Sequence, residues 1–238
     1  MKRRKKVLLG SVLILAFLAS AVGILFLLIR HEPAFYRRAA VPPGKDRKQN
    51  SNRFLSKCIK LIQGIQTSRP DEPIEVTFRA DEVNSYLDED LGKKGIILPD
   101  NISEPRVEFD DGIVRVAFRY GKKPWSTVIS IDLKVWHKEP NIVAMELQRV
   151  RAGLLPIAPQ SFLEDLSESA RQQNIELTWY RRGGNPVALL RFQADEPTPT
   201  IWLQRLELRT GTMIIRGCST ETGNWSPAGP VAIQSASN

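Results

Sequence analysis

Hydrophobic and polar residues alternate along much of the chain between residues 74 and 216, and this two-residue period predicts strands with one apolar face. Turn motifs separate the alternating segments, and Asp111-Gly112 between two of them is a strong hairpin signal. Neighbouring strands joined in this way are expected to be antiparallel. The expected strands cover residues 74–78, 107–109, 114–120, 129–135, 143–147, 175–181, 187–192, 202–209 and 213–216.

Three segments have the 3- and 4-residue spacing of amphipathic helices instead. They are residues 51–66, a short acidic helix at about residues 83–91, and residues 159–173, where Phe162 and Leu163 belong to the apolar stripe. The combination predicts an α+β fold, in which a long, curved antiparallel β-meander is wrapped on helices.

The N-terminal part of the chain has a third pattern. Val7 to Ile29 is an uncharged run of 23 residues. As a helix it would be about 34 Å long, and a bilayer core is about 30 Å thick. A cleaved signal peptide is the alternative, because Ala19-Ser20-Ala21 resembles a cleavage site. Strong hydrophobicity continues to Ile29, however, and favours an uncleaved transmembrane anchor.

The charges around this run predict its orientation. Residues 2–6 are all Lys or Arg, and such a cluster stays in the cytoplasm by the positive-inside rule. We therefore expect a single-pass protein of the cell (inner) membrane, with the following domain on the periplasmic or extracellular side.

The chain divides into four parts by composition. Residues 1–29 are the basic cluster and the anchor, and residues 30–50 are a Pro-rich, basic juxtamembrane linker that brings Phe35 and Tyr36 to the membrane interface. Residues 51–217 are the exported α+β domain. Residues 218–238 have loop composition and are expected to be a disordered tail.

The net charge of +8 at first suggests a nucleic-acid-binding protein. Residues 1–53, however, hold 12 Lys and Arg against 2 Asp and Glu, whereas residues 54–238 hold 22 against 24. The positive charge thus belongs to the anchor and linker, and the domain itself is close to neutral. No nucleic-acid partner is expected.

Recognised catalytic and metal-binding motifs are missing from the sequence. The two histidines, His31 and His137, have no neighbours of the kind that a catalytic triad or a zinc site requires, and His137 is expected at an exposed strand end. There is no phosphate-binding loop, dinucleotide fingerprint or nucleophile elbow. We expect no enzyme, no cofactor and no metal. Cys58 and Cys218 either form a disulfide in an oxidising compartment or remain unpaired thiols.

The order of elements and several short motifs resemble the YpmS-like family of membrane-anchored bacterial proteins, which is related in design to tubular lipid-binding (BPI-like) domains. The resemblance covers the anchor and roughly residues 72–217. It is carried by the following stretches: Thr77-Phe78, Asp81-Glu82-Val83-Asn84-Ser85-Tyr86-Leu87, Asp110-Asp111-Gly112 and Gly153-Leu154-Leu155-Pro156-Ile157-Ala158-Pro159. It implies a domain that binds or shields an apolar ligand, most plausibly a lipid, at the outer surface of the cytoplasmic membrane.

The stretch at residues 153–159 would then bend a strand at Gly153 and bring the following helix back across the apolar sheet face. Strand, bend and helix would form one wall of a groove for acyl chains. The alternative is that the helix fills this space as ordinary core, and that the domain is a structural or interaction module that docks an envelope partner protein. The expected groove residues are Val114, Val116, Phe118, Ile129, Ile131, Leu133, Val143, Met145, Leu147, Leu154, Leu155 and Phe162.

Overall fold

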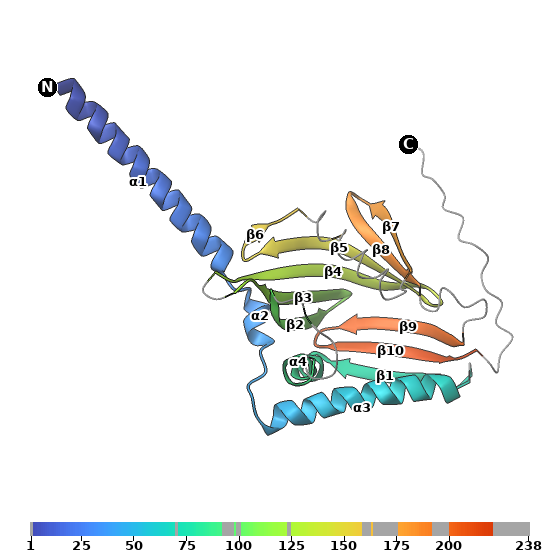
Figure 1. The fold of residues 1–238 in the computed structure, drawn as a ribbon. Coiled ribbons are helices and arrows are strands. Elements are labelled where there is room, and N and C mark those ends of the chain that lie inside the picture. Colours follow the sequence, from blue (N-terminus) through green and yellow to red (C-terminus); the bar gives the residue numbers. More distant parts are fainter. Residues whose placement is uncertain are drawn as a thin grey trace, which may run out of the picture.

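A computed structural model describes residues 2–69, 71–91, 98, 101–122, 125–158, 163, 176–191 and 200–220 (Figure 1). The helices are α1 (Lys2–Arg30), α2 (Ala34–Arg38), α3 (Lys45–Thr67) and α4 (Ala80–Glu89). The strands are β1 (Ile74–Arg79), β2 (Ile102–Asp110), β3 (Ile113–Tyr120), β4 (Thr127–Glu139), β5 (Ile142–Ala152), β6 (Leu155–Pro156), β7 (Glu176–Arg182), β8 (Asn185–Arg191), β9 (Ile201–Arg209) and β10 (Thr212–Ser219).

The strands form two antiparallel sheets, which confirms the α+β class. The larger sheet has the order β2-β3-β4-β5-β8-β7, and β6 pairs with the end of β5. The smaller sheet has the order β1-β10-β9. The last two strands therefore leave the meander: β10 pairs with β1, where Ile74 lies opposite Gly217, and β9 pairs with the other edge of β10.

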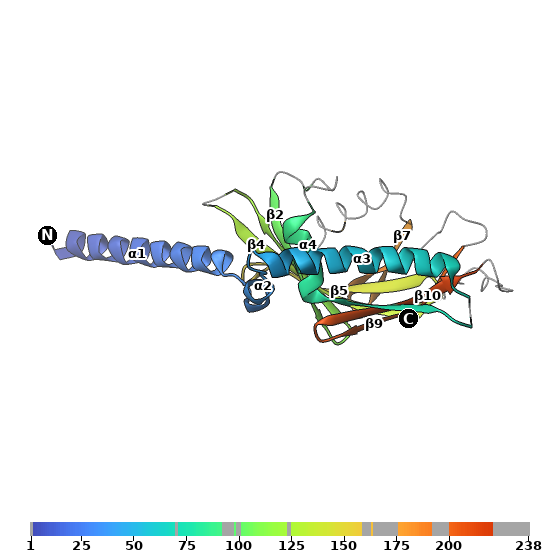
Figure 2. The same ribbon diagram turned by 90° about the horizontal axis from the view of Figure 1, so that it is seen from below.

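Long helix α3 covers the smaller sheet, and Figure 2 shows it running along the strands with α4 beside its N-terminal half. The ring of Phe54 on α3 packs against the rings of Phe78 and Tyr86, with centroids 5.6 and 5.0 Å away. Lys57 of α3 forms a 2.6 Å ion pair with Glu82 of α4, whose carboxylate is buried. Phe54 and Ile65 of the apolar stripe predicted for residues 51–66 thus face the sheet and α4, whereas Ile62 of the same stripe is 57% exposed.

Two buried asparagine side chains connect neighbouring layers of the fold. Each donates one hydrogen bond and accepts one hydrogen bond from the backbone of a strand, as a paired strand residue would. Asn84 donates to the Val107 carbonyl and accepts from the Val107 N–H, both at 2.8 Å, which joins α4 to β2. Asn141 does the same between the β4–β5 turn and β9, donating to Ile201 O and accepting from Leu203 N, both at 2.6 Å. These contacts hold the smaller sheet across the larger one.

Several expectations differ from the structure in detail. The linker at residues 30–50 contains α2 and the first turns of α3, and Tyr36 is fully buried instead of lying at the membrane interface. The His137 ring lies 3.1 Å from Leu203 O of β9, so this residue joins the two sheets. Cys58 and Cys218 are free thiols. Strand β10 extends to Ser219, and most of the predicted tail lies outside the described residues.

Candidate functional site

The candidate site is the inner face of the larger sheet, where the register brings the predicted groove residues of three strands together. Strands β3 and β4 place Val114 opposite Leu133, Val116 opposite Ile131 and Phe118 opposite Ile129. Strands β4 and β5 place Leu133 opposite Leu147, Val135 opposite Met145 and His137 opposite Val143, with a register shift after Asp132. Nine of the twelve predicted residues therefore lie on one continuous face: Val114, Val116, Phe118, Ile129, Ile131, Leu133, Val143, Met145 and Leu147.

The smaller sheet covers one end of this face. Leu203 and Leu208 of β9 are buried in one hydrophobic cluster with Phe109, Val135 and Val143. The predicted residues Val114, Leu133 and Met145 pack against the same cluster, together with Met213 and Ile215 of β10. This end of the face is core between two sheets. The smaller sheet fills this end, whereas the sequence had suggested that a helix at residues 159–173 fills it.

The other end of the face carries a separate cluster, which we call the anchor-side cluster. It consists of Ile131, Leu147 and Val150, all of which are at most 5% exposed, with Phe118, Ile129, Leu133 and Leu163 packed against them. Leu163 is the single described residue of the helix predicted at 159–173, and it is helical and contacts the sheet face. Phe162 and the rest of that helix lie outside the described residues.

The anchor-side cluster begins where α1 ends. Thr127, the first residue of β4, donates a 2.5 Å hydrogen bond to Ile29 O, and the backbone N–H of Leu154 donates to Leu28 O at 3.0 Å. These bonds satisfy carbonyls of the last helical turn, which have no partner within a helix. Ile129 stands two residues after Thr127 and pairs with Ala152 of β5. The first apolar residue of the sheet face therefore lies only two residues along β4 from the contact with α1.

Gly153 makes this close approach of α1 possible. Its φ of +60° is favourable only for glycine, and a Cβ added there would overlap the carbonyl oxygens of Leu28 and Ile29. The neighbouring Leu154 is 46% exposed beside α1, so it does not close the groove as the sequence led us to expect. Leu155 is half-buried in β6. The stretch at residues 153–156 therefore contacts the last turn of α1 through Gly153 and Leu154.

Charged and aromatic groups of the α1–α2 connection hold the same end of the domain. Arg119 of β3 bonds to Glu32 at 2.6 Å and lies 3.5 Å from Glu104. Tyr36 donates a 2.9 Å hydrogen bond to Glu104 O, and the guanidinium of Arg106 stacks over its ring at 4.3 Å. Burial raises the pKa of Tyr36 to about 12, partly opposed by the nearby positive charge of Arg106. The phenol is therefore neutral, and α1 and the sheet are connected by buried contacts on both sides of residue 32.

No pattern in the sequence indicates most of these docking residues. Thr127, Glu32 and Arg119 are ordinary strand or linker residues until the fold brings them to the end of α1.

Within the described residues, no group of three His, Cys, Asp or Glu side chains is placed to hold a metal ion.

A cleft of about 490 Å³ lies elsewhere, at the outer edge of β2 between α2 and α4. Its charged residues are already paired, since Arg115 bonds to Glu108 at 2.6 Å and to Asp110 at 3.1 Å. The cleft therefore offers no unpaired charge from these residues to a polar ligand.

The chain matches no protein-family model, and no curated protein or solved structure matches it at significant similarity. Its function is inferred from its own geometry.

Proposed function

We propose that the protein is a single-pass membrane protein whose domain receives an apolar ligand, a lipid acyl chain, at the anchor-side cluster. In this proposal α1 crosses the cytoplasmic membrane with its basic N-terminus inside, and the domain lies on the periplasmic or extracellular side. The protein shields or carries the lipid and performs no chemical reaction on it.

The membrane part of the proposal rests on α1. Leu13–Arg30 is long and apolar enough to cross a bilayer, and none of this stretch is buried against the domain. Leu15, Phe17 and Leu27 are each more than 65% exposed. A row of such side chains is unfavourable in water, because each fully exposed large apolar side chain forgoes about 1.5–3 kcal/mol of burial energy. A lipid environment removes this penalty.

The observation that carries the lipid part is the continuity between α1 and the anchor-side cluster. The hydrogen bond from Thr127 to Ile29 O places the start of β4 at the end of the proposed span. Ile129 and Ile131 then continue inward along the same face of the strand. An acyl chain leaving the bilayer beside α1 would reach the apolar side chains of Ile129 and Ile131 directly after Thr127.

The same proposal gives a role to the meander. A larger sheet that curves over the anchor-side cluster would form one wall of a sheath for an acyl chain, and Leu163, which packs against this cluster, would belong to the other wall. Ile129 and Phe118 are only half-buried, and they stand at the end nearest α1. They would be the first residues that the acyl chain touches.

A photoactivatable phospholipid tests the proposal directly. The full chain is reconstituted in vesicles containing a lipid with a diazirine in its acyl chain, irradiated, and mapped by peptide mass spectrometry. We expect crosslinks on β4 and β5 peptides that carry Ile131 and Leu147, in addition to α1. Leu147→Trp should reduce those crosslinks and leave crosslinks to α1 unchanged.

Crosslinks confined to α1 and its immediate surroundings would show that the sheet face never receives lipid. The protein would then be an anchored module with an ordinary core.

A second candidate function follows from α3. Ile59 and Ile62 lie one helical turn apart and are 54% and 57% exposed, on the side of α3 that the sheet does not cover. An envelope protein that docks there would bury both. A photoreactive residue in place of Ile59 would crosslink to such a partner in intact cells. Ser56→photoreactive residue, on a neighbouring exposed position of the helix, serves as a control for nonspecific contact.

A further inference from the structure

Four large hydrophobic side chains are exposed around the point where α1 meets the domain. Trp125 is 78% exposed, Tyr120 and Leu154 are each 46% exposed, and Ile157 is 40% exposed. Tyr120 is the last residue of β3 and Trp125 lies in the connection to β4, while Leu154 and Ile157 stand on either side of β6. Exposed apolar side chains gathered at one place mark an interaction site. We call these four residues the exit surface.

Direct contacts fix the position of the exit surface along α1. The Trp125 ring packs edge-on against the ring of Phe26, with centroids 6.0 Å apart. Leu154 donates its N–H to Leu28 O, and Tyr120 pairs with Thr127, whose hydroxyl bonds to Ile29 O. Phe26 lies four residues before the end of α1, which corresponds to about 6 Å along the helix. The exit surface is therefore level with the last turn of α1.

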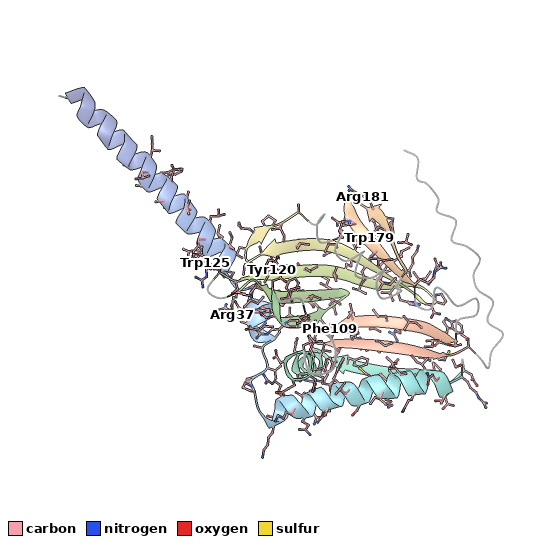
Figure 3. The ribbon with its side chains drawn as sticks, viewed as in Figure 1. Arg37, Phe109, Tyr120, Trp125, Trp179 and Arg181 are labelled. Carbon is pink, nitrogen blue, oxygen red and sulfur yellow. The ribbon has the colours of Figure 1, made fainter. Side chains whose placement is uncertain are left out.

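Basic residues accompany these side chains. Arg30, Arg37 and Lys122 are all exposed, and the guanidinium of Arg30 lies 5.2 Å from the centre of the Phe26 ring. Figure 3 shows Trp125, Tyr120 and Arg37 close to the end of α1, whereas Trp179 lies away from it on β7. Aromatic rings with Lys and Arg at the end of an apolar helix are the composition typical of a membrane–water interface.

We infer that the exit surface docks onto the bilayer that α1 crosses, with Trp125 at the boundary between headgroups and acyl chains and the basic residues among anionic headgroups. The inference rests on the membrane-spanning role of α1 in the proposed function. It goes beyond that role, because an anchored domain on a flexible tether needs no surface of its own. Two attachments, α1 and the exit surface, fix the tilt of the domain and hold the start of β4 at the membrane.

Fluorescence quenching by brominated lipid tests the inference on the full chain. The protein is reconstituted in vesicles of phosphatidylethanolamine and phosphatidylglycerol whose acyl chains are brominated near the headgroup. The tryptophan emission should be quenched, and Trp125→Phe should remove most of that quenching. Trp179→Phe is the matched control and should leave the quenching nearly unchanged. The double variant Leu154→Ser, Ile157→Ser should reduce the quenching of Trp125, whereas Ile59→Ser on α3 should not.

Alkaline extraction of the same vesicles separates the two ways of failing. If the protein resists extraction but Trp125→Phe is quenched as strongly as the wild type, the exit surface does not dock and the anchor stands. If the protein is extracted from the vesicles, α1 does not span the membrane, and both the docking and the proposed function are wrong. Retention together with the loss of quenching in Trp125→Phe supports the docking.

Discussion

Gly153 lies so close to Leu28 that a Cβ at residue 153 would overlap the Leu28 carbonyl oxygen. The turn after β5 and the last turn of α1 are thus in backbone contact. This contact joins the apolar helix to the sheet without a flexible linker between them.

The first prediction tests this contact. Gly153→Ala should destabilise the domain and release α1 from this contact, since both the backbone strain and the overlap with Leu28 and Ile29 oppose a methyl group. Gly183→Ala is a matched control, because its φ of +57° is nearly the same and its surroundings are open. Left-handed backbone alone costs about 1–2 kcal/mol. Urea unfolding of the full chain in nanodiscs should show a clearly larger loss for Gly153→Ala. Equal losses for both variants would mean that α1 does not pack on Gly153.

The second prediction concerns the pairing of the two sheets by Asn141. Asn141→Gly keeps the positive φ of 61° but removes both side-chain hydrogen bonds to β9. The buried Leu203 N–H is left without a partner, which costs about 1–3 kcal/mol. Hydrogen exchange should show the amide of Leu203 accelerated more than amides of β3, which do not contact Asn141. Uniform acceleration throughout the domain would contradict a local role for this side chain.

The third prediction is a pH dependence. The pKa of Tyr36 is raised from 10.0 to about 12 by burial, so the unfolded chain loses this proton at lower pH than the folded protein. The stability from the neutral phenol is therefore complete below pH 10 and is lost as the pH rises toward 12. One unit of pKa difference corresponds to about 1.4 kcal/mol, so about 1 kcal/mol should disappear between pH 9 and pH 11. Tyr36→Phe should lack this part of the loss. The prediction would be refuted if the free energy of unfolding fell by the same amount in the wild type and in Tyr36→Phe between pH 9 and pH 11.

The fourth prediction separates core from groove at Met145. Its side chain packs in the cluster between the two sheets, so Met145→Trp should overpack the cluster and cost about 1–3 kcal/mol. Leu147→Ala, which truncates a 4% exposed side chain, should cost about 2–5 kcal/mol. Chemical unfolding of the three proteins gives both values. Full stability of Met145→Trp would reveal space between the sheets.

The sequence predicted the strands and their apolar faces well, because alternation is a local property. The alternation predicts that Val114, Ile131 and Leu147 lie on apolar faces of their strands, and the pairing of β3, β4 and β5 brings them onto one face. Helix α3 was also recognised, although its first turn begins at Lys45 instead of Ser51. Residues 45–50 are polar, so they add no apolar period to the pattern.

The element that packs on each apolar strand face could not be predicted from the sequence in the same way. Alternating residues in β9 and β10 have the same pattern whether these strands extend the meander or form another sheet. The pairing of β10 with β1 depends on contacts between distant residues, such as Thr77 with Ile214. The burial of Tyr36 likewise depends on Ala117, whose small side chain leaves room for the ring. A five-residue helix such as α2 has no period from which either contact can be inferred.

Among the described residues, strand β1 pairs with β10 alone, and this arrangement sets the order of events during synthesis. The ribosome releases β1 well over one hundred residues before β10, so the edge of β1 stays open while the larger sheet is made. The smaller sheet cannot close until β10 has been synthesised, and a chain truncated before Thr212 never closes it. Such a chain leaves the backbone edges of β1 and β9 that face β10 unpaired. Completion of β10 is therefore the step that distinguishes a finished molecule from an aborted one.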